Sequence, residues 1–216
     1  MKIYDVSMTI TPDMQVYKNI QSKKPLIEVV SDFSTSSAHE TKLSMNLHTG
    51  THMDFPLHMI ENGATSDTLD ITRLITPVKV FDLTHLEKKI TEEDLKKIDI
   101  QKSDFVLFKT INSYDEKFIS EFVYIDESAS LYLASKKISG VGVDGLGVER
   151  SQANHPTHKN LMKNDIIIIE GLRLKDVKQG NYFMYALPIK IQHSDALPLS
   201  VILLEEPYEH LPSKSK

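Results

Sequence analysis

Residues 48–58 of this chain read His48-Thr49-Gly50-Thr51-His52-Met53-Asp54-Phe55-Pro56-Leu57-His58. Three of the nine histidines in the chain fall within this stretch, together with one aspartate. Imidazole nitrogens and carboxylate oxygens are ligands that suit Zn²⁺ or Mn²⁺. The composition of the stretch therefore predicts a metal site.

The backbone around this stretch is expected to turn rather than to form a helix. Gly50 and Pro56 both disfavour a regular helix. Residues 43–48 alternate between apolar and polar side chains, which predicts a strand whose polar face ends at His48. Because glycine adopts conformations closed to other residues, Gly50 is expected to turn the chain after that strand.

The spacing after the turn is expected to bring the ligands together. His52 and Asp54 are two residues apart, so they lie on the same side of a locally extended chain. Folding them back toward His48 gives three converging ligands and leaves positions open for water. His58 follows Asp54 after a proline and is the candidate proton-transfer base.

Two other interpretations of the stretch remain open. Loop histidines are often surface residues, since polar side chains mostly face solvent. His58 could also close the coordination as a fourth protein ligand, which would make a structural or storage site without turnover. The histidine and aspartate side chains suit a metal, and Gly50 and Pro56 favour a turn that would bring them together. This agreement favours a metal site over a surface cluster.

A second carboxylate stands in an unusual place later in the chain. Residues 165–170 contain four consecutive isoleucines and are expected to form a buried strand that Glu170 ends. A carboxylate directly after a core strand needs a partner if it points inward. His158 precedes this strand beside a proline, and by itself it fits a loop residue as well as a ligand.

The remaining elements predict a mixed α/β protein with a substantial sheet. Residues 140–145 formally match GxGxxG, but the glycines lie within an apparent strand and no helical pattern follows, which argues against a dinucleotide site. Leu131 and Ala134 are expected to share one face of the helix predicted at residues 126–137. Strands are expected at residues 3–6, 25–30, 40–48, 78–83, 105–108, 138–144, 165–170, 182–190 and 199–204, and helices at 91–98 and 126–137.

Composition narrows the class of protein further. With 216 residues, the chain is expected to form one domain spanning residues 1–216. A net charge of −5 without basic blocks indicates neither nucleic acid nor membrane as a partner. There is no cysteine, so any metal must use His, Asp or Glu. The N-terminus lacks the apolar run of a signal peptide, and we expect a cytoplasmic protein.

The motif His48-Thr-Gly-Thr-His52-x-Asp54-x-Pro56-x-His58 resembles the signature of the metal-dependent cyclase-like hydrolases, the family of bacterial kynurenine formamidases and isatin hydrolases. The resemblance implies that His48, His52 and Asp54 bind a metal and that His58 acts as acid/base. It also implies that the later ligands of the family correspond to two more residues, His158 and Glu170, which would complete a second metal position. The cofactor expected from this is one or two Zn²⁺ ions, with Mn²⁺ as the alternative.

The same resemblance implies a swivelling β/β/α fold with a barrel-like mixed sheet flanked by helices, in homodimers or homotetramers. Residues 194–198 resemble a late loop near the site. The family usually closes over its substrate with a Trp-containing segment, whereas this chain has no Trp. Tyr17 is the nearest aromatic replacement, either as a substrate contact or as a packed loop residue. Tyr17 and Phe55 are the candidate substrate contacts.

The leading functional hypothesis is a metal-dependent hydrolase of a small amide. A metal lowers the pKa of a bound water toward ~7 and so supplies hydroxide at neutral pH. The resemblance implies an arylformamidase of tryptophan catabolism, which cleaves N-formylkynurenine to kynurenine and formate. The alternatives are opening of a cyclic amide, as in isatin hydrolases, and a cyclase-type dehydration at the same site. A non-enzymatic metal-binding protein is the remaining class.

Overall fold

The computed structural model describes residues 2–205 of the chain. Its strands are β1 (Ile3–Asp5), β2 (Leu26–Ser31), β3 (Glu40–Ser44), β4 (His52–Asp54), β5 (Ile75–Asp82), β6 (Lys89–Ile90), β7 (Phe105–Lys109), β8 (Tyr124–Ile125), β9 (Gly140–Val143), β10 (Ile167–Glu170), β11 (Gly180–Pro188) and β12 (Ala196–Glu205). The α-helices are α1 (Glu92–Leu95), α2 (Glu127–Lys136) and α3 (Pro156–Lys163). Short 3₁₀ turns are η1 (Tyr17–Asn19), η2 (Gln21–Lys23), η3 (Pro56–His58), η4 (Ser66–Thr68), η5 (Ile71–Leu74) and η6 (Ile111–Tyr114).

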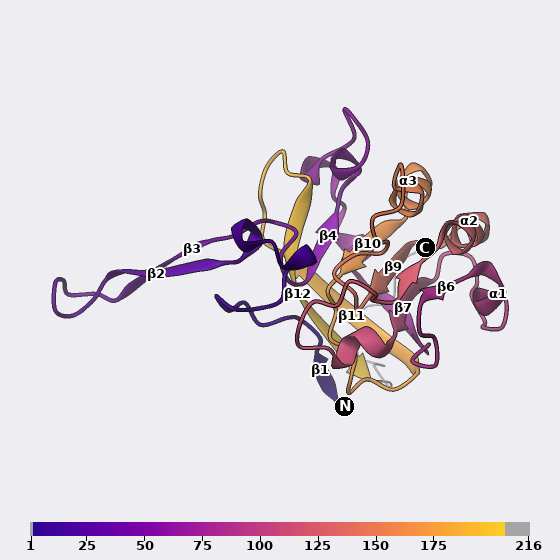
Figure 1. Cartoon of the computed structure of the whole chain (residues 1–216), viewed down its shortest axis with the longest axis horizontal. Helices are drawn as coiled ribbons and strands as arrows, with labels where there is room; N and C mark the ends of the chain where they lie inside the picture. The colour runs from indigo at the N-terminus through magenta and orange to yellow at the C-terminus, as the bar shows by residue number, and fades with distance from the viewer. Residues whose placement is uncertain (1, 206–216) are drawn as a thin grey trace.

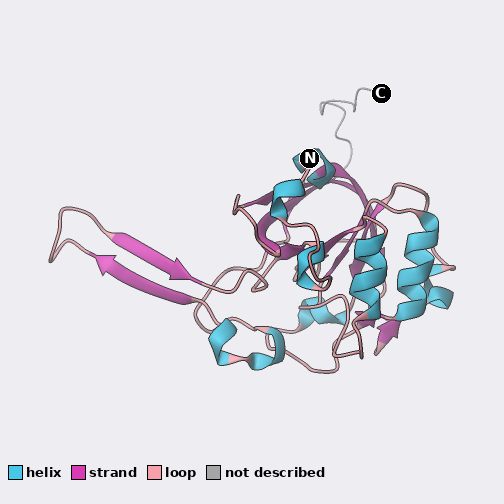
Figure 2. Cartoon of the chain, turned by 90° about the horizontal axis from the view of Figure 1, so that it is seen from above, coloured by secondary structure: helices cyan, strands magenta, loops and turns pink. Residues whose placement is uncertain are grey.

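The main sheet closes on itself. Its strands follow the order β1-β12-β11-β5-β7-β9-β10-β4, and β4 also pairs with β12, so all but β1 form a seven-stranded ring. The strands β5, β7, β9 and β10 run parallel, whereas β4, β11 and β12 pair antiparallel with their neighbours. Figure 2 shows this ring with the longer helices standing side by side on one flank of it. The expected mixed α/β fold with a barrel-like sheet flanked by helices is confirmed.

The sheet separates two hydrophobic cores. One fills the barrel and includes Leu107 and Ile169, and the other lies between the sheet and the helices and includes Phe108 and Ile168. Successive side chains of a strand point to opposite faces, so β7 and β10 contribute to both cores. This explains the run of isoleucines before Glu170, because a strand buried on both faces needs apolar residues at every position.

Helices α1 and α2 begin where the sequence indicates. The Asp126 side chain accepts a hydrogen bond from the backbone amide of Ala129 and caps α2. The face of α2 that packs inward includes Leu133, which is fully buried, whereas Leu131 is 53% exposed. None of the helices within residues 2–205 is long and apolar enough to cross a membrane.

The glycines of residues 140–145 serve strand packing, as the sequence indicates. A side chain at Gly140 would collide with the ring of Phe105 on the neighbouring strand β7. After Gly145 the chain continues as bends and loop up to α3, and no helix starts there. The GxGxxG match therefore reflects close strand packing rather than nucleotide binding.

Strands β2 and β3 form a hairpin that leaves the body of the molecule (Figure 1), and we call residues 26–44 the arm. The strand predicted for residues 40–48 was too long, since β3 ends at Ser44. Every residue of β3 is exposed, so Leu43, on the apolar side of the predicted alternation, faces solvent. The alternation of apolar and polar residues at 43–48 therefore does not mark a strand face that packs against the core.

Candidate metal centre

Strand β4 holds two of the predicted ligands in the middle of the ring. It is hydrogen-bonded to β10 on one side and to β12 on the other, and its three residues are buried. His52 and Asp54 are separated by one residue of extended chain, so their side chains share one face, as the sequence indicates. Glu170 is the antiparallel partner of His52 in β10, and directly opposed residues lie on the same face of a sheet. The pairing of β10 with β4 thus places Glu170 beside His52 and Asp54.

The loop before β4 positions His48 without a strand. The side chain of Asn46 accepts a hydrogen bond from the His48 amide at 2.9 Å, and its carbonyl accepts one from Thr49 at 3.1 Å. Asparagine favours turns of this kind because its side chain imitates a backbone carbonyl. Gly50 follows with φ of +74°, which confirms the turn expected there.

The two threonines of the motif tie this loop to other segments. The Thr49 hydroxyl donates to the carbonyl of Lys23 at 2.8 Å. The Thr51 hydroxyl donates to the carbonyl of Gly171 at 2.7 Å and accepts from the amide of Met8 at 2.8 Å. The loop is therefore anchored both to β10 and to the N-terminal segment.

Helix α3 brings the third imidazole of the predicted ligand set, His158. His158 lies in the first turn of α3, after Pro156 at its first position, where proline's missing N–H costs nothing. The His158 Nδ1 donates to Glu149 Oε1 at 2.7 Å. Glu149 also accepts a hydrogen bond from the Thr157 amide at 3.0 Å, so the carboxylate is held in place from the helix N-terminus. This arrangement leaves His158 Nε2 directed to the carboxylates of the cluster.

The predicted ligands meet around Asp54. The Asp54 Oδ1 lies 3.0 Å from His48 Nδ1 and 3.3 Å from His52 Nε2, and Asp54 Oδ2 lies 3.5 Å from His158 Nε2. Glu170 spans the same gap, with Oε2 at 3.4 Å from His52 Nε2 and Oε1 at 3.3 Å from His158 Nε2. The structure therefore brings together all five residues that the sequence analysis named as ligands.

The chemistry of these atoms fits a divalent cation. The His52 Nδ1 lies 2.9 Å from the carbonyl of Gly50 and must donate to it, which leaves an unprotonated Nε2 in the neutral ring. That Nε2 and both oxygens of Asp54 are buried and make no well-aligned hydrogen bond among the described residues. Buried polar atoms normally have partners, and a cation would serve all three.

The charges of the metal-free cluster support the same view. Burial disfavours a charged His52, but Asp54 and Glu170 outweigh burial and raise the pKa of His52 to about 10. Burial and the charge of Asp54 both oppose ionisation of Glu170, yet His158 and His52 hold the pKa of Glu170 at about 2. The imidazoles likewise hold the pKa of Asp54 well below its ordinary value, against the effect of burial. Without a metal, protons on the imidazoles take the place of a cation.

His58 lies at the mouth of the cluster. Its ring is stacked on that of His48 with centroids 3.9 Å apart, and its Nδ1 is 3.7 Å from Asp195 Oδ2. Asp195 accepts a hydrogen bond from His48 Nε2 at 2.8 Å, so one carboxylate serves both rings. Burial lowers the pKa of His58, which favours its neutral form. His58 Nδ1 or Nε2 is also near enough to His48 and Asp54 to share an ion with them.

A cavity of about 170 Å³ opens in front of these side chains. Tyr17 lines it and makes edge contacts with the rings of Phe118 and Phe122, so it is both packed and accessible to a ligand. Phe55 does not line this cavity: its side chain is buried in the barrel core. Phe55 follows β4 directly, and its side chain packs in the barrel core, so this cavity gives no support to the expected contact of Phe55 with substrate, which stays a prediction.

Three residues of the site had weaker signals in the sequence. Asp195 lies in the late loop whose resemblance to the family was noted, but no local pattern pairs it with His48. Glu149 and Arg150 follow the glycine-laced strand, where nothing in the spacing marks them as part of the site.

The chain is similar to known proteins over most of its length. Residues 4–150 match the model of the Cyclase family, described as "Putative cyclase". The chain is 30% identical to the kynurenine formamidase of Salinibacter ruber over 96% of this chain and 99% of that protein. A solved structure titled a potential metal-dependent hydrolase with cyclase activity is 49% identical, covers 95% of this chain and 99% of its own, and superposes with a TM-score of 0.89.

A more distant likeness concerns the fold alone. Isatin hydrolase A from Labrenzia aggregata is 23% identical and has a TM-score of 0.81, over 95% of this chain and 94% of its own. The match to the family model spans more than half of the chain and includes the whole His48–His58 motif. The chain therefore belongs to the cyclase family.

Proposed function

We propose that this chain is a metal-dependent hydrolase of a small amide, and that an arylformamide such as N-formylkynurenine is its substrate. The observation that carries the proposal is the unsatisfied set of buried atoms at the centre of the site, His52 Nε2 and the two oxygens of Asp54. Such a set is costly unless a cation binds there. The kynurenine formamidase named among the relatives supports the choice of an amide.

Two sets of donors would hold the ions. The first consists of His48 Nδ1, His52 Nε2 and Asp54 Oδ1, and the second of Asp54 Oδ2, His158 Nε2 and Glu170 Oε1. Nitrogen and oxygen donors without sulfur suit Zn²⁺, with Mn²⁺ as the alternative. When bound, a divalent ion polarises an amide carbonyl and makes water acidic enough to act as a nucleophile at neutral pH.

His58 would handle the proton. It lines the cavity beside His48, and burial keeps it neutral and able to accept a proton near neutral pH. The leaving nitrogen of an amide must be protonated to depart as an amine, so the same ring can return the proton. Asp195, near Nδ1 of this ring, would stabilise the imidazolium that forms in between.

The other residues of the site would orient the ligands. Glu149 fixes the tautomer of His158, and Asp195 and the Gly50 carbonyl do the same for His48 and His52. Such contacts raise the basicity of a ligating imidazole and fix its orientation.

The test is metal analysis together with a substrate panel. The purified protein should carry up to two Zn²⁺ or Mn²⁺ per chain, and Glu170→Gln should lose one of them selectively. Chelation should abolish hydrolysis of N-formylkynurenine and formanilide, and added metal should restore it. Turnover of isatin instead of the formamides would favour cyclic amide opening, and a dehydration would favour a cyclase. Full activity in a metal-free preparation would refute the proposal.

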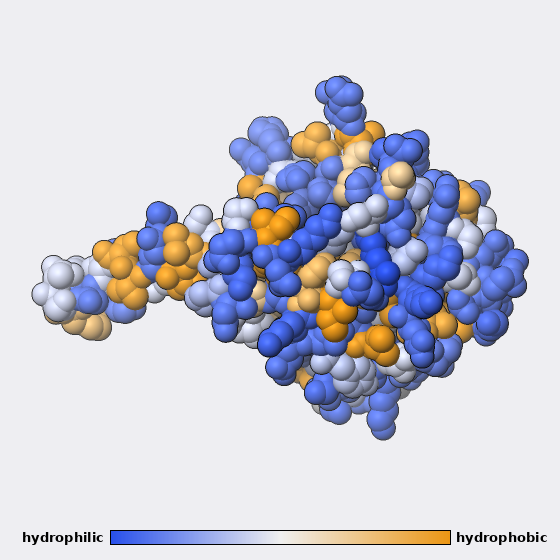
Figure 3. Space-filling model, in the orientation of Figure 1, coloured by the Kyte–Doolittle hydropathy of each residue, from blue (hydrophilic) through white to orange (hydrophobic). Residues whose placement is uncertain are grey.

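The arm supports the expectation of a homodimer or homotetramer. Val29 and Val30 on β2 and Phe33 in the turn after it are more than half exposed, and the arm projects away from the body. Figure 3 shows apolar atoms along the arm. An apolar surface that projects into solvent is typical of a protein–protein contact, and a second copy of the chain is the simplest occupant.

A further inference from the structure

Asp144 is a buried carboxylate that the proposed mechanism does not use. It follows β9 directly and is only 3% exposed. Its Oδ2 accepts hydrogen bonds from the Thr110 amide at 2.6 Å and from the Ser113 hydroxyl at 2.7 Å. Its Oδ1 accepts from the Thr110 hydroxyl at 2.7 Å and from Asn112 Nδ2 at 3.3 Å. A buried acceptor of this kind is costly to separate from its donors, so Asp144 holds the segment that carries them.

The donors all lie at the start of one loop. Thr110 caps η6, and Asn112 and Ser113 belong to η6. Because β7 and β9 are neighbouring parallel strands, their ends lie at the same edge of the sheet, which places Asp144 beside Thr110. Asn112 also closes the loop, since its side chain both accepts from the Val123 amide and donates to the Val123 carbonyl, each at 2.8 Å. Residues 113–122, which we call the aromatic loop, therefore begin and end beside Asp144.

The aromatic loop packs behind a residue of the cavity wall. The rings of Phe118 and Phe122 contact the ring of Tyr17 edge-on, with centroids 5.5 Å and 6.3 Å apart. Phe122 also packs on the residue after Asp144, because a Cβ at Gly145 would lie 3.2 Å from its ring. Tyr17 lines the cavity in front of the metal centre, and the short turn η1 that carries it contains no buried residue. Contacts with the aromatic loop thus help to fix the Tyr17 ring.

Other hydrogen bonds hold the same loop only near its start. Arg173 Nη2 donates to the carbonyls of Ser113 at 2.8 Å and Asp115 at 3.1 Å, and Gln15 Nε2 donates to the Asp115 carbonyl at 2.9 Å. These bonds are partly buried, whereas those to Asp144 are fully buried. Loss of the bonds to Asp144 should therefore displace the aromatic loop without unfolding it.

We propose that Asp144 is a positioning residue for substrate binding, and that it acts by holding the aromatic loop against Tyr17. An aromatic ring that its neighbours already hold in place binds a ligand without the entropy cost of ordering it. The consequence for substrate binding rests on the proposed function, whereas the placement of Tyr17 does not. Asp144 has no hydrogen bond to a predicted ligand or to His58, so its loss should raise KM and change kcat and metal content little.

Tyr17→Trp provides a direct readout of the cavity wall, because the chain contains no other Trp. In this background Asp144→Asn keeps the shape of the side chain but removes the charge, and Thr110→Val removes one hydroxyl donor. Either change should shift the Trp emission to longer wavelength and make it easier to quench with acrylamide. Thr110→Ser keeps the hydroxyl and should restore the emission of the parent.

Kinetics of the metal-loaded protein are measured with Tyr17 in place. Asp144→Asn and Thr110→Val should raise KM for N-formylkynurenine and formanilide by roughly three- to tenfold, as expected when part of a charge-assisted hydrogen bond is lost from the binding step. Thermal unfolding shows whether each variant is folded. Thr110→Val removes one donor and keeps the side-chain volume, so it carries the test if Asp144→Asn does not fold.

Thr91→Val is the matched control. Thr91 caps α1 and donates to Asp94 at 2.6 Å, as Thr110 caps η6 and donates to Asp144, but Thr91 does not line the cavity. The control should lower Tm and leave the Trp emission and KM unchanged.

The outcomes separate this inference from the proposed function. Unchanged emission and KM in the folded Asp144→Asn and Thr110→Val variants, or equal changes in Thr91→Val, would overturn the role of Asp144. Loss of metal or an equally large fall in kcat would also overturn it, since the effect would then pass through the metal centre. If no formamide is hydrolysed, the proposed function fails, and the Trp emission alone decides whether Asp144 holds the wall at Tyr17.

Discussion

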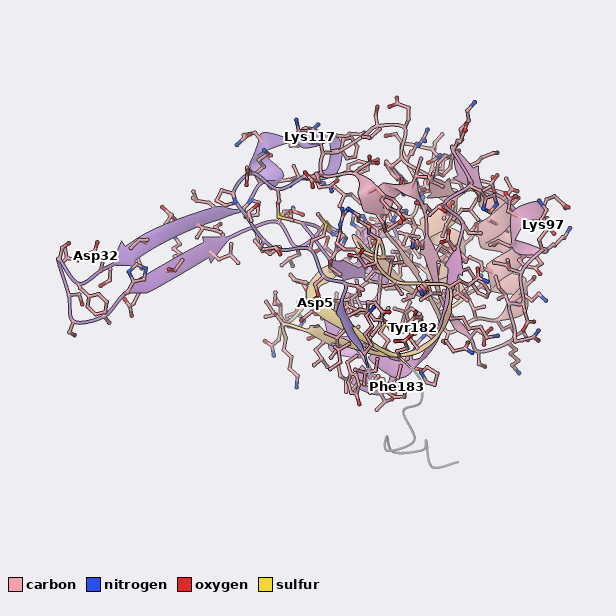
Figure 4. The ribbon with its side chains drawn as sticks, turned by 90° about the horizontal axis from the view of Figure 1, so that it is seen from below. Asp5, Asp32, Lys97, Lys117, Tyr182 and Phe183 are labelled. Atoms are coloured by element: carbon pink, nitrogen blue, oxygen red, sulfur yellow. The ribbon has the colours of Figure 1, made fainter. Side chains whose placement is uncertain are left out.

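Apolar side chains are usually buried and charged side chains usually exposed. The arm departs from the first rule and the β4–β10 region from the second. In the arm, Val29 and Phe33 face solvent, and Figure 4 shows Asp32 near its far end, well away from the body. In the β4–β10 region, Asp54 and Glu170 are buried within the ring of strands. Either arrangement costs free energy in an isolated chain. Each region is therefore the basis of one proposal made above, a second copy of the chain at the arm and a cation at the buried carboxylates.

Asp54→Asn should have the largest effect, and it tests whether the buried carboxylates bind a cation. The amide keeps the shape of the side chain but removes the charge that faces three imidazoles, so activity should fall to background and bound metal should be lost. The measurements are kcat and metal content per chain. Asp67→Asn is the control, since Asp67 is exposed and its hydrogen bonds come from Thr65 and His193, which are not in the cluster. Retention of two metals by Asp54→Asn would contradict the role of Asp54.

His58→Ala tests whether the half-buried ring transfers protons or holds metal. Proton transfer by a positioned side chain contributes on the order of 10²–10⁴-fold, so kcat should fall by that factor with the metal content unchanged. Loss of metal in this variant would make His58 a ligand, in keeping with its closeness to His48 and Asp54. That result would revive a closed, structural site.

Glu149→Gln tests a buried carboxylate that is not a predicted ligand but is bonded to one, His158. The variant keeps a hydrogen-bonding group near His158 Nδ1 but loses the carboxylate, so metal affinity should fall by about 10–100-fold. Competition with a chelator gives the affinity directly. Glu127→Gln, on the first turn of α2, is the control. An unchanged affinity would show that Glu149 only caps α3.

The pH dependence of stability should differ between the metal-free and metal-loaded proteins. In the metal-free protein the pKa of His52 is raised from 6.5 to about 10 by Asp54 and Glu170, against the effect of burial. This protonation stabilises the fold fully below pH 6.5, and the contribution is lost as the pH rises through 10. Metal binding needs the deprotonated ring and so strengthens as the pH rises.

The difference in Tm between loaded and chelated protein should therefore grow as the pH is raised from 6.5 toward 10. Thermal unfolding at several pH values with and without a chelator measures it. A difference that is constant or shrinks with rising pH would contradict the protonated state of the empty cluster.

The smallest effect on the chain itself is expected in the arm. The pair Val29→Ser and Val30→Ser should change the stability of a monomer by less than ~0.5 kcal/mol per site, because both side chains are exposed. The same changes should weaken self-association, measured by analytical ultracentrifugation. Lys42→Ser, on the neighbouring strand, is the control. A protein that is monomeric before any change would remove the argument for a second copy.

Much of the site could be predicted because its information is local. The ligand types, the turn at Gly50 and the extended His52–Asp54 pair follow from residue chemistry and period-2 geometry within a few positions. The same holds for the caps of α1 and α2. The alternation of residues 43–48 was misleading, because β3 ends at Ser44 and Leu43 faces solvent, so no strand face packs there against the core.

The sequence by itself thus determined which residues could bind a metal and where the chain turns to present them. Only the tertiary structure decided that Glu170 faces His52, that Asp195 joins His48 to His58, and that Phe55 belongs to the core. These contacts depend on β4 pairing with both β10 and β12, strands more than a hundred residues away. Ladder register is a long-range property, set by how whole strands bury their faces, and no local pattern in the sequence encodes it.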